Sequence, residues 1–94
     1  MSPRPAYKFK ATPQFWKRFY ALPPASKEAV RAAWRVFKLD PFAPGLGTHK
    51  IHGLSARSGT TVYSVVLAPD LRAVFHIIGD TVWTLDIGTH ALYR

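Results

Sequence analysis

The sequence predicts an α+β domain in which a strand and two helices precede a run of strands. Apolar residues at helical spacing dominate the first half of the chain, β-branched and aromatic residues dominate the second half, and glycine or proline marks the boundaries. Hairpin pairing between consecutive strands favours an antiparallel twisted sheet. The predicted order, β-α-α-β-β-β, places an N-terminal helical hairpin on one face of this sheet and leaves the other face open.

Length and composition indicate one domain. The chain has 94 residues, 48% of them hydrophobic, which suffices for a single core. No stretch approaches the roughly 18 to 20 apolar residues of a membrane span, and the N-terminus has no apolar signal core. The absence of cysteine fits a reducing compartment. We therefore expect a single cytoplasmic domain over residues 1–94, beginning with a loose basic leader at residues 1–6.

The charge balance points to anionic partners. Thirteen lysines and arginines oppose five acids, which gives a net charge of +8. Such a field attracts polyanions through phosphate contacts and counterion release. Nucleic acid, a ribosome surface and an acidic protein are all compatible with it, and a merely basic surface is the alternative.

The first half of the chain contains the predicted helical hairpin. Residues 7–11 alternate apolar and basic side chains, as a half-buried strand does. Thr12 is expected to cap a helix that starts at Pro13, and Ser26 to cap a second helix over residues 27–38. The second helix buries one apolar stripe and carries basic residues on its other side. These basic residues are Lys27, Arg31, Arg35 and Lys38.

The second half is predicted to form the sheet. The expected segments are a loop over 39–47, a short strand over 49–54, a turn over 55–59, and strands over 60–67, 71–78 and 81–87. A two-residue turn at Gly79-Asp80, of a kind that suits type II′, makes the last two strands antiparallel. With Ile78 opposite Thr81, Arg72 lies opposite Ile87.

The end of the chain carries candidate chemistry. After the last strand stops at Gly88, an imidazole, a phenol and a guanidinium follow at His90, Tyr93 and Arg94. The predicted register brings Arg72 to the same end of the sheet, where a phosphate could meet all these groups. RNA cleaves itself when its 2′-OH is deprotonated and the charge at phosphorus is stabilised, without a metal or a thiol.

Two short motifs carry a family resemblance. Leu-Arg-Ala-Val-Phe at residues 71–75, followed by Ile-Gly-Thr-His at residues 87–90 and then Tyr93, resembles the RelE/ParE superfamily of bacterial type II toxins, nearest to its RelE-, YafQ- and HigB-like members. The resemblance extends from Tyr7 to Tyr93. It implies the same α+β architecture, a ribosome-dependent mRNA endoribonuclease that inhibits translation, no cofactor, and a cognate acidic antitoxin.

The resemblance also assigns roles to residues. Arg72 matches the phosphate-binding arginine, His90 the histidine of the YafQ-like ending, and Tyr93 the terminal aromatic residue, so these three are the catalytic candidates. RelE-like members carry paired lysines on the strand that corresponds to residues 63–67, and here that stretch contains no base. The proton acceptor would then be His90, or His52 or Lys50 from the neighbouring strand. The expected RNA-binding residues are Lys50, His52, Arg57, Arg94, Arg31 and Arg35.

Each candidate has a structural alternative. Arg72 could pair with Asp86 or Asp70, His90 could bond a carbonyl, and Tyr93 could pack on the sheet. The basic side of the second helix could be solvated, or could anchor ribosomal RNA or the antitoxin. We expect no metal site, because two of the histidines, at positions 49 and 52, would point to opposite faces of a strand.

Two other functions compete with the nuclease. A ParE-like protein would share the fold and inhibit DNA gyrase without a nuclease site, which agrees with the missing strand bases. The Gly88-Thr89-His90 ending argues against that function. A non-toxic orphan that only binds RNA or an antitoxin is the third interpretation.

Overall fold

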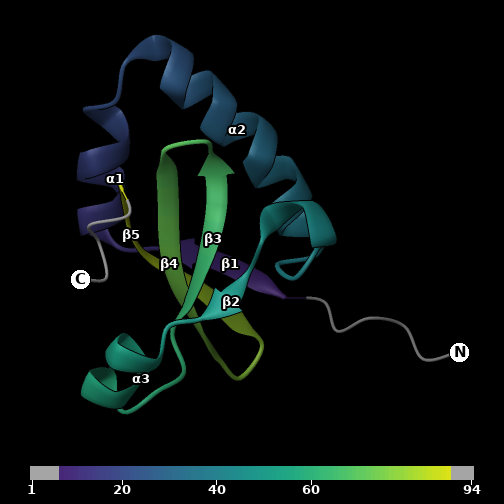
Figure 1. The fold of residues 1–94 in the computed structure, drawn as a ribbon, viewed down its shortest axis with the longest axis vertical. Coiled ribbons are helices and arrows are strands. Elements are labelled where there is room, and N and C mark those ends of the chain that lie inside the picture. The colour runs from purple at the N-terminus through teal and green to yellow at the C-terminus, as the bar shows by residue number, and fades with distance from the viewer. Residues whose placement is uncertain (1–6, 90–94) are drawn as a thin grey trace, which may run out of the picture.

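The structure, a computed structural model, describes residues 7–89, except the side chains of residues 57 and 58. Helices α1 and α2 lie towards one end of the view in Figure 1, and α3 lies at the other. The predicted architecture of an N-terminal strand, a helical hairpin and a C-terminal antiparallel sheet is confirmed. The elements are β1 (Lys8–Ala11), α1 (Pro13–Tyr20), α2 (Pro24–Leu39), a 3-10 turn η1 (Pro44–Leu46), β2 (His49–Lys50), α3 (His52–Ser58), β3 (Tyr63–Ala68), β4 (Leu71–Ile78) and β5 (Thr81–Gly88).

The five strands form one sheet in the order β1-β5-β4-β3-β2. Strands β2 to β5 pair antiparallel with their neighbours, as expected. Strand β1 runs parallel to β5, so the sheet is mixed, because β1 is joined to the rest of the sheet by the helical hairpin and not by a local turn. Its ends are fixed by two backbone bonds, from Lys8 N to the Asp80 oxygen at 2.8 Å and from Thr12 N to the Thr84 oxygen at 3.0 Å.

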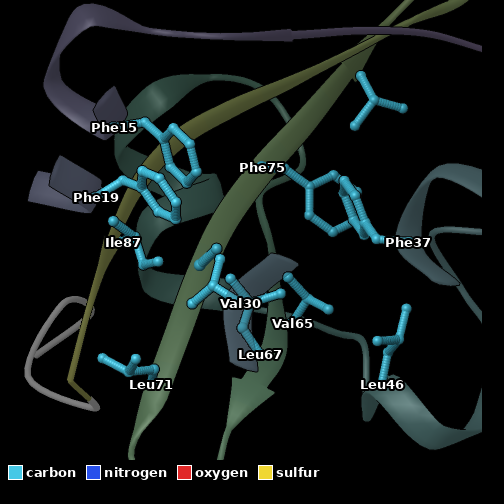
Figure 2. Close-up of a cluster of buried hydrophobic side chains, with 12 residues drawn as sticks. Phe15, Phe19, Val30, Phe37, Leu46, Val65, Leu67, Leu71, Phe75 and Ile87 are labelled. Carbon is cyan, nitrogen blue, oxygen red and sulfur yellow. The ribbon is translucent and has the colours of Figure 1, made fainter. Parts of the chain in front are cut away.

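The core lies between the helical hairpin and one face of the sheet. Phe15 and Phe19 enter it from α1, Phe37 enters from α2, and Phe75 of β4 meets Phe37 edge-on at a ring distance of 5.0 Å (Figure 2). The side chains that alternate with these along the strands occupy the opposite face of the sheet, called the open face below. On β4 the open face carries Arg72 and His76.

The two long helices begin in different ways. Thr12 caps α1 as predicted, because its Oγ1 accepts a hydrogen bond from Phe15 N at 3.2 Å. The prediction that Ser26 caps α2 is wrong. The helix starts at Pro24, three residues before the predicted start at residue 27, and the proline ring supplies a helical φ and no unpaired N–H. Neither these helices nor any other in the described part of the chain has the length and apolar character to cross a membrane.

The segment after β2 departs most from the prediction. The expected strand over 49–54 is only two residues long, and the expected turn over 55–59 is the helix α3, which ends at Gly59 with a φ of +75°. Ser55 explains the helix, because its Oγ accepts a hydrogen bond from Val62 N at 2.8 Å and so ties α3 to the start of β3. That contact joins residues seven positions apart, and no local sequence pattern predicts it.

A β-bulge in β5 changes the predicted register. Ile78 opposes Thr81 as expected, but Asp86 rather than Leu85 opposes Val74, so Leu85 is the extra residue. Arg72 consequently lies opposite Gly88 and not opposite Ile87. The hydroxyl of Thr12 donates to the carbonyl oxygen of Leu85 at 2.6 Å, which joins the start of α1 to the bulge.

Candidate nucleic-acid interface

Arg72 is the second residue of β4 and lies on the open face, next to the turn between β3 and β4. Its Nη1 donates to the carbonyl oxygens of Ala68, Pro69 and Leu71, each at 3.1 Å. These bonds close the turn between β3 and β4 and hold the side chain against it. All three use the same nitrogen, so the other edge of the guanidinium takes no part in them.

The acids that could have neutralised Arg72 have other positions. Asp86, on the open face beside Val74, pairs with Arg18 of α1 at 3.3 Å. Its Oδ1 also accepts from Ile87 N at 2.8 Å. Within the described part of the chain, Arg72 forms no ion pair with Asp86 or Asp70. The described partners of Arg72 are thus neutral carbonyls, which leave its positive charge uncompensated.

The remaining members of the predicted catalytic group, His90 and Tyr93, lie outside the described residues, as does Arg94. The structure does place their point of departure. Gly88 is the register partner of Arg72, so β5 ends beside the backbone of Arg72. The bulge moves this departure point one residue along β5 from its predicted place.

Lys50 and His52 line a shallow groove beside α3. Both side chains are exposed, and Ser55, Thr60 and other small residues complete the groove. Thr60 Oγ1 also lies 3.2 Å from His76 Nδ1, in a hydrogen bond that links this loop to the open face of β4. Arg57 belongs to the same helix, although its side chain is not described.

The open face of β3 is uncharged. Ser64 and Val66 are the β3 residues that share this face with Arg72, through pairing with β4. Ser64 is fully buried. Neither position offers a proton acceptor comparable with a lysine, in agreement with the missing bases of the sequence.

Arg31 and Arg35 belong to a different surface. Both are exposed on α2 and line a groove between α1 and α2 together with aromatic residues of both helices. Arg31 pairs with Glu28 at 3.2 Å and lies 5.5 Å from the ring of Phe19. Arg31 and Arg35 therefore lie on the helical side of the molecule, whereas Arg72 lies on the open face of the sheet.

A row of three side chains crosses the open face and was missed by the sequence analysis. Register places Lys10 of β1 beside Trp83 of β5, and Trp83 beside His76 of β4. Lys10 Nζ lies 5.4 Å from the centre of the Trp83 ring. The alternation of Trp83 with its buried neighbours Val82 and Thr84 was the available signal.

The histidines do not form a metal site in the described part of the chain. Within residues 7–89, no group of three or more His, Asp or Glu side chains is placed to hold a metal ion. His52 begins a helix and does not continue the strand of His49, so the prediction that the two side chains point to opposite faces of one strand is wrong.

Comparison with known proteins identifies the fold. No protein-family model and no curated protein matches the sequence. Among solved structures, RelE in the RelE-RelB complex of Pyrococcus horikoshii matches with a TM-score of 0.71 at 17% identity, over 93% of this chain and 98% of that one.

Two bacterial structures match over similar lengths. The Escherichia coli DinJ-YafQ complex matches with a TM-score of 0.66 at 15% identity, over 95% of this chain and 99% of that one. The YoeB/ParE toxin of Agrobacterium tumefaciens matches with a TM-score of 0.65 at 20% identity, over 88% and 98%. The chain therefore has the fold of the RelE, YafQ and YoeB toxins of toxin-antitoxin systems.

Proposed function

We propose that this protein is the toxin of a type II toxin-antitoxin module, a metal-independent endoribonuclease that cleaves mRNA on the ribosome in the cytoplasm and so inhibits translation. One observation carries the proposal. On the fold of the RelE and YafQ toxins, an arginine without a described acidic partner lies on the open sheet face, beside the residue from which the segment Thr89 to Arg94 departs.

The proposed roles follow from the chemistry of RNA self-cleavage. The 2′-OH attacks the adjacent phosphorus, its proton leaves, and the 5′ oxygen departs with a proton. Arg72 would stabilise the charge on the phosphoryl oxygens with the edge of its guanidinium that does not face the turn. His90 would transfer protons, and Tyr93 would orient or stack a base. Lys50 and His52 would contact the RNA backbone beside α3.

The proposed partners are the ribosome and an antitoxin. The net charge of +8 suits ribosomal RNA, with Arg31 and Arg35 on the helical side as anchoring cations. RelE and YafQ were crystallised in complexes with RelB and DinJ. By analogy, an acidic antitoxin segment that folds on binding would keep this protein inactive.

The decisive test is toeprinting on translated mRNA. The free protein should inhibit translation and produce new 5′ ends at the codon in the ribosomal A site. His90→Ala should abolish these ends while ribosome binding is retained. Inhibition without new 5′ ends would reject the nuclease. A parallel loss of cleavage, binding and thermal stability in His90→Ala would make His90 a structural residue.

A gyrase inhibitor of the ParE type is the second candidate. The uncharged open face of β3 favours it, because the resemblance implies paired lysines on this strand in RelE-like members, whereas the open-face residues here are Ser64 and Val66. A DNA supercoiling assay separates the two functions. Inhibition of gyrase by the purified protein, together with undamaged mRNA, would establish the ParE-like activity.

A further inference from the structure

A cavity at the edge of the sheet collects an unusual set of side chains. Its volume is about 420 Å³, and all three tryptophans of the chain, Trp16, Trp34 and Trp83, line it. Lys10 and Lys38 complete the charged part of its wall, and among the described residues no acidic side chain lines it. The apolar remainder is Phe9 and Ala11 of the edge strand β1.

The cavity is reached from both faces of the sheet around β1. Phe9 faces the helices, because its ring meets Phe37 at 5.6 Å. Lys10 and its register partner Trp83 therefore face the open side. Only an edge strand allows residues of both faces to line one cavity, and β1 is such a strand.

The tryptophan rings pack against neighbouring side chains but remain partly exposed to solvent. Trp34 stacks on Phe15 at 5.4 Å with an interplanar angle of 28°, which fixes its plane. Trp16 is 43% exposed, and Trp83 is partly exposed. Lys10 is exposed, so its contact with the Trp83 ring is a weak one that an incoming group can replace.

We propose that this cavity is a nucleobase-binding subsite for single-stranded RNA, in which a base stacks on Trp83 and the flanking phosphates contact Lys10 and Lys38. Every base has a π-face, so indole rings accept any of them, and cations beside the rings neutralise the backbone. An aliphatic anchor of a peptide would find few aliphatic partners here. The proposal rests on the proposed function only in taking RNA as the ligand.

The position of the subsite fits a strand that also reaches Arg72. Trp83 is paired with His76, and His76 is four residues from Arg72 along β4. At ~3.3 Å per residue, the two sites are about 13 Å apart along the open face. An RNA strand bound at both would cross β4 and β5, and Trp83 would set which nucleotide stands at Arg72.

Intrinsic fluorescence provides a direct test, because the tryptophans that emit are the ones that line the cavity. The purified protein is titrated with a short single-stranded oligouridylate. Binding should quench the emission, whereas inorganic polyphosphate should bind without comparable quenching. Trp83→Ala should weaken RNA binding roughly 5- to 100-fold, as expected for the loss of one stacked base. Trp83→Phe, which keeps an aromatic face, should retain most of the affinity.

The lysines supply a matched pair of variants. Lys8 and Lys10 are exposed on the same strand and the same face, but only Lys10 lines the cavity. Lys10→Gln should lower the slope of log affinity against log salt by about 0.7, and Lys8→Gln should leave that slope nearly unchanged. Thermal unfolding of each variant identifies any loss of fold, and the comparison of the two lysine variants remains valid if Trp83→Ala is unstable.

Three results would overturn the subsite: unchanged RNA affinity in folded Trp83→Ala, equal effects of Lys10→Gln and Lys8→Gln, or displacement of the RNA by polyglutamate with the same quenching. The last result would identify an acidic-peptide site instead. Binding is measured without ribosomes or cleavage, so a protein that never cleaves mRNA can still show the subsite. Conversely, the protein could cleave mRNA while Trp83→Ala and Lys10→Gln bind RNA as the parent does. The proposed function would then stand and the subsite would be rejected.

Discussion

At the scale of single residues, Arg72 combines two tasks. Its Nη1 holds three carbonyl groups of the β3–β4 turn, and the opposite edge of the guanidinium is proposed to bind phosphate. Arg72→Lys keeps the charge and a donor for the turn but loses the planar fork. We expect a small change in melting temperature and a fall of about 10²- to 10³-fold in single-turnover cleavage.

Arg35→Lys is the control for this substitution, because Arg35 lies on the helical surface and should show neither effect. Cleavage by Arg72→Lys at the parental rate would remove the phosphate role. A large loss of melting temperature would show that the bonds to the turn are the main contribution of Arg72.

Thr12 is the residue that joins α1 to the bulge. Its hydroxyl accepts from Phe15 N and donates to the carbonyl of Leu85. Thr12→Val removes both bonds with little change of shape, and the loss of a cap and of a buried acceptor's partner should cost about 1 to 3 kcal/mol. Thr12→Ser should restore most of it. Urea unfolding measures the difference, and equal midpoints for the valine variant and the parent would contradict this role.

At the scale of elements, the sequence predicts best where side-chain periodicity and turn chemistry agree. The bounds of β4 match the predicted ones because Gly79-Asp80 and Pro69-Asp70 delimit a run of β-branched and aromatic residues. The bulge could also have been inferred. Strict alternation of buried and exposed side chains from Val82 onward would bury Asp86 and expose Ile87. One extra residue in the strand gives the observed arrangement, in which Ile87 is buried and Asp86 is partly exposed.

Other features depend on contacts that no local pattern contains. The pairing of β1 with β5 and the helical state of residues 52–58 are fixed by partners elsewhere in the fold. For the candidate site, the predicted register placed Arg72 at the end of the sheet where the last strand stops, and the structure has it there. The predicted register paired Arg72 with Ile87, whereas the bulge in β5 shifts the pairing by one residue to Gly88. Trp83 was missed because its cavity also needs residues of both helices.

Helix α3 should depend on Ser55. Ser55→Ala leaves Val62 N without its described acceptor, which should cost about 1 to 3 kcal/mol and speed hydrogen exchange in α3 and at the start of β3. Ser26→Ala is the matched control, because Ser26 does not cap α2, and its effect should stay within about 0.5 kcal/mol. Slow exchange in Ser55→Ala, or destabilisation by Ser26→Ala, would contradict these assignments.

At the scale of the whole molecule, charge should govern affinity for the ribosome. Arg31→Glu combined with Arg35→Glu removes two cations from the helical surface and lowers the net charge from +8 to +4, since each reversal subtracts two. Ribosome binding should weaken and its salt dependence should become shallower. Arg72→Lys, with its charge unchanged, is the comparison. Unaltered binding across a salt series would exclude the helical surface as an anchor.

The pairing of β1 with β5 has a consequence for synthesis. Thr12 and Leu85 are 73 positions apart, yet one hydrogen bond joins them. An edge of the sheet thus stays unfilled until the ribosome has made everything between the two strands, and such long loops close slowly. A chain stopped at Asp80 should show no cooperative thermal transition by circular dichroism. If the proposed function holds, a nascent chain is harmless to the ribosome that is making it, because its native sheet can form only after translation has passed β5.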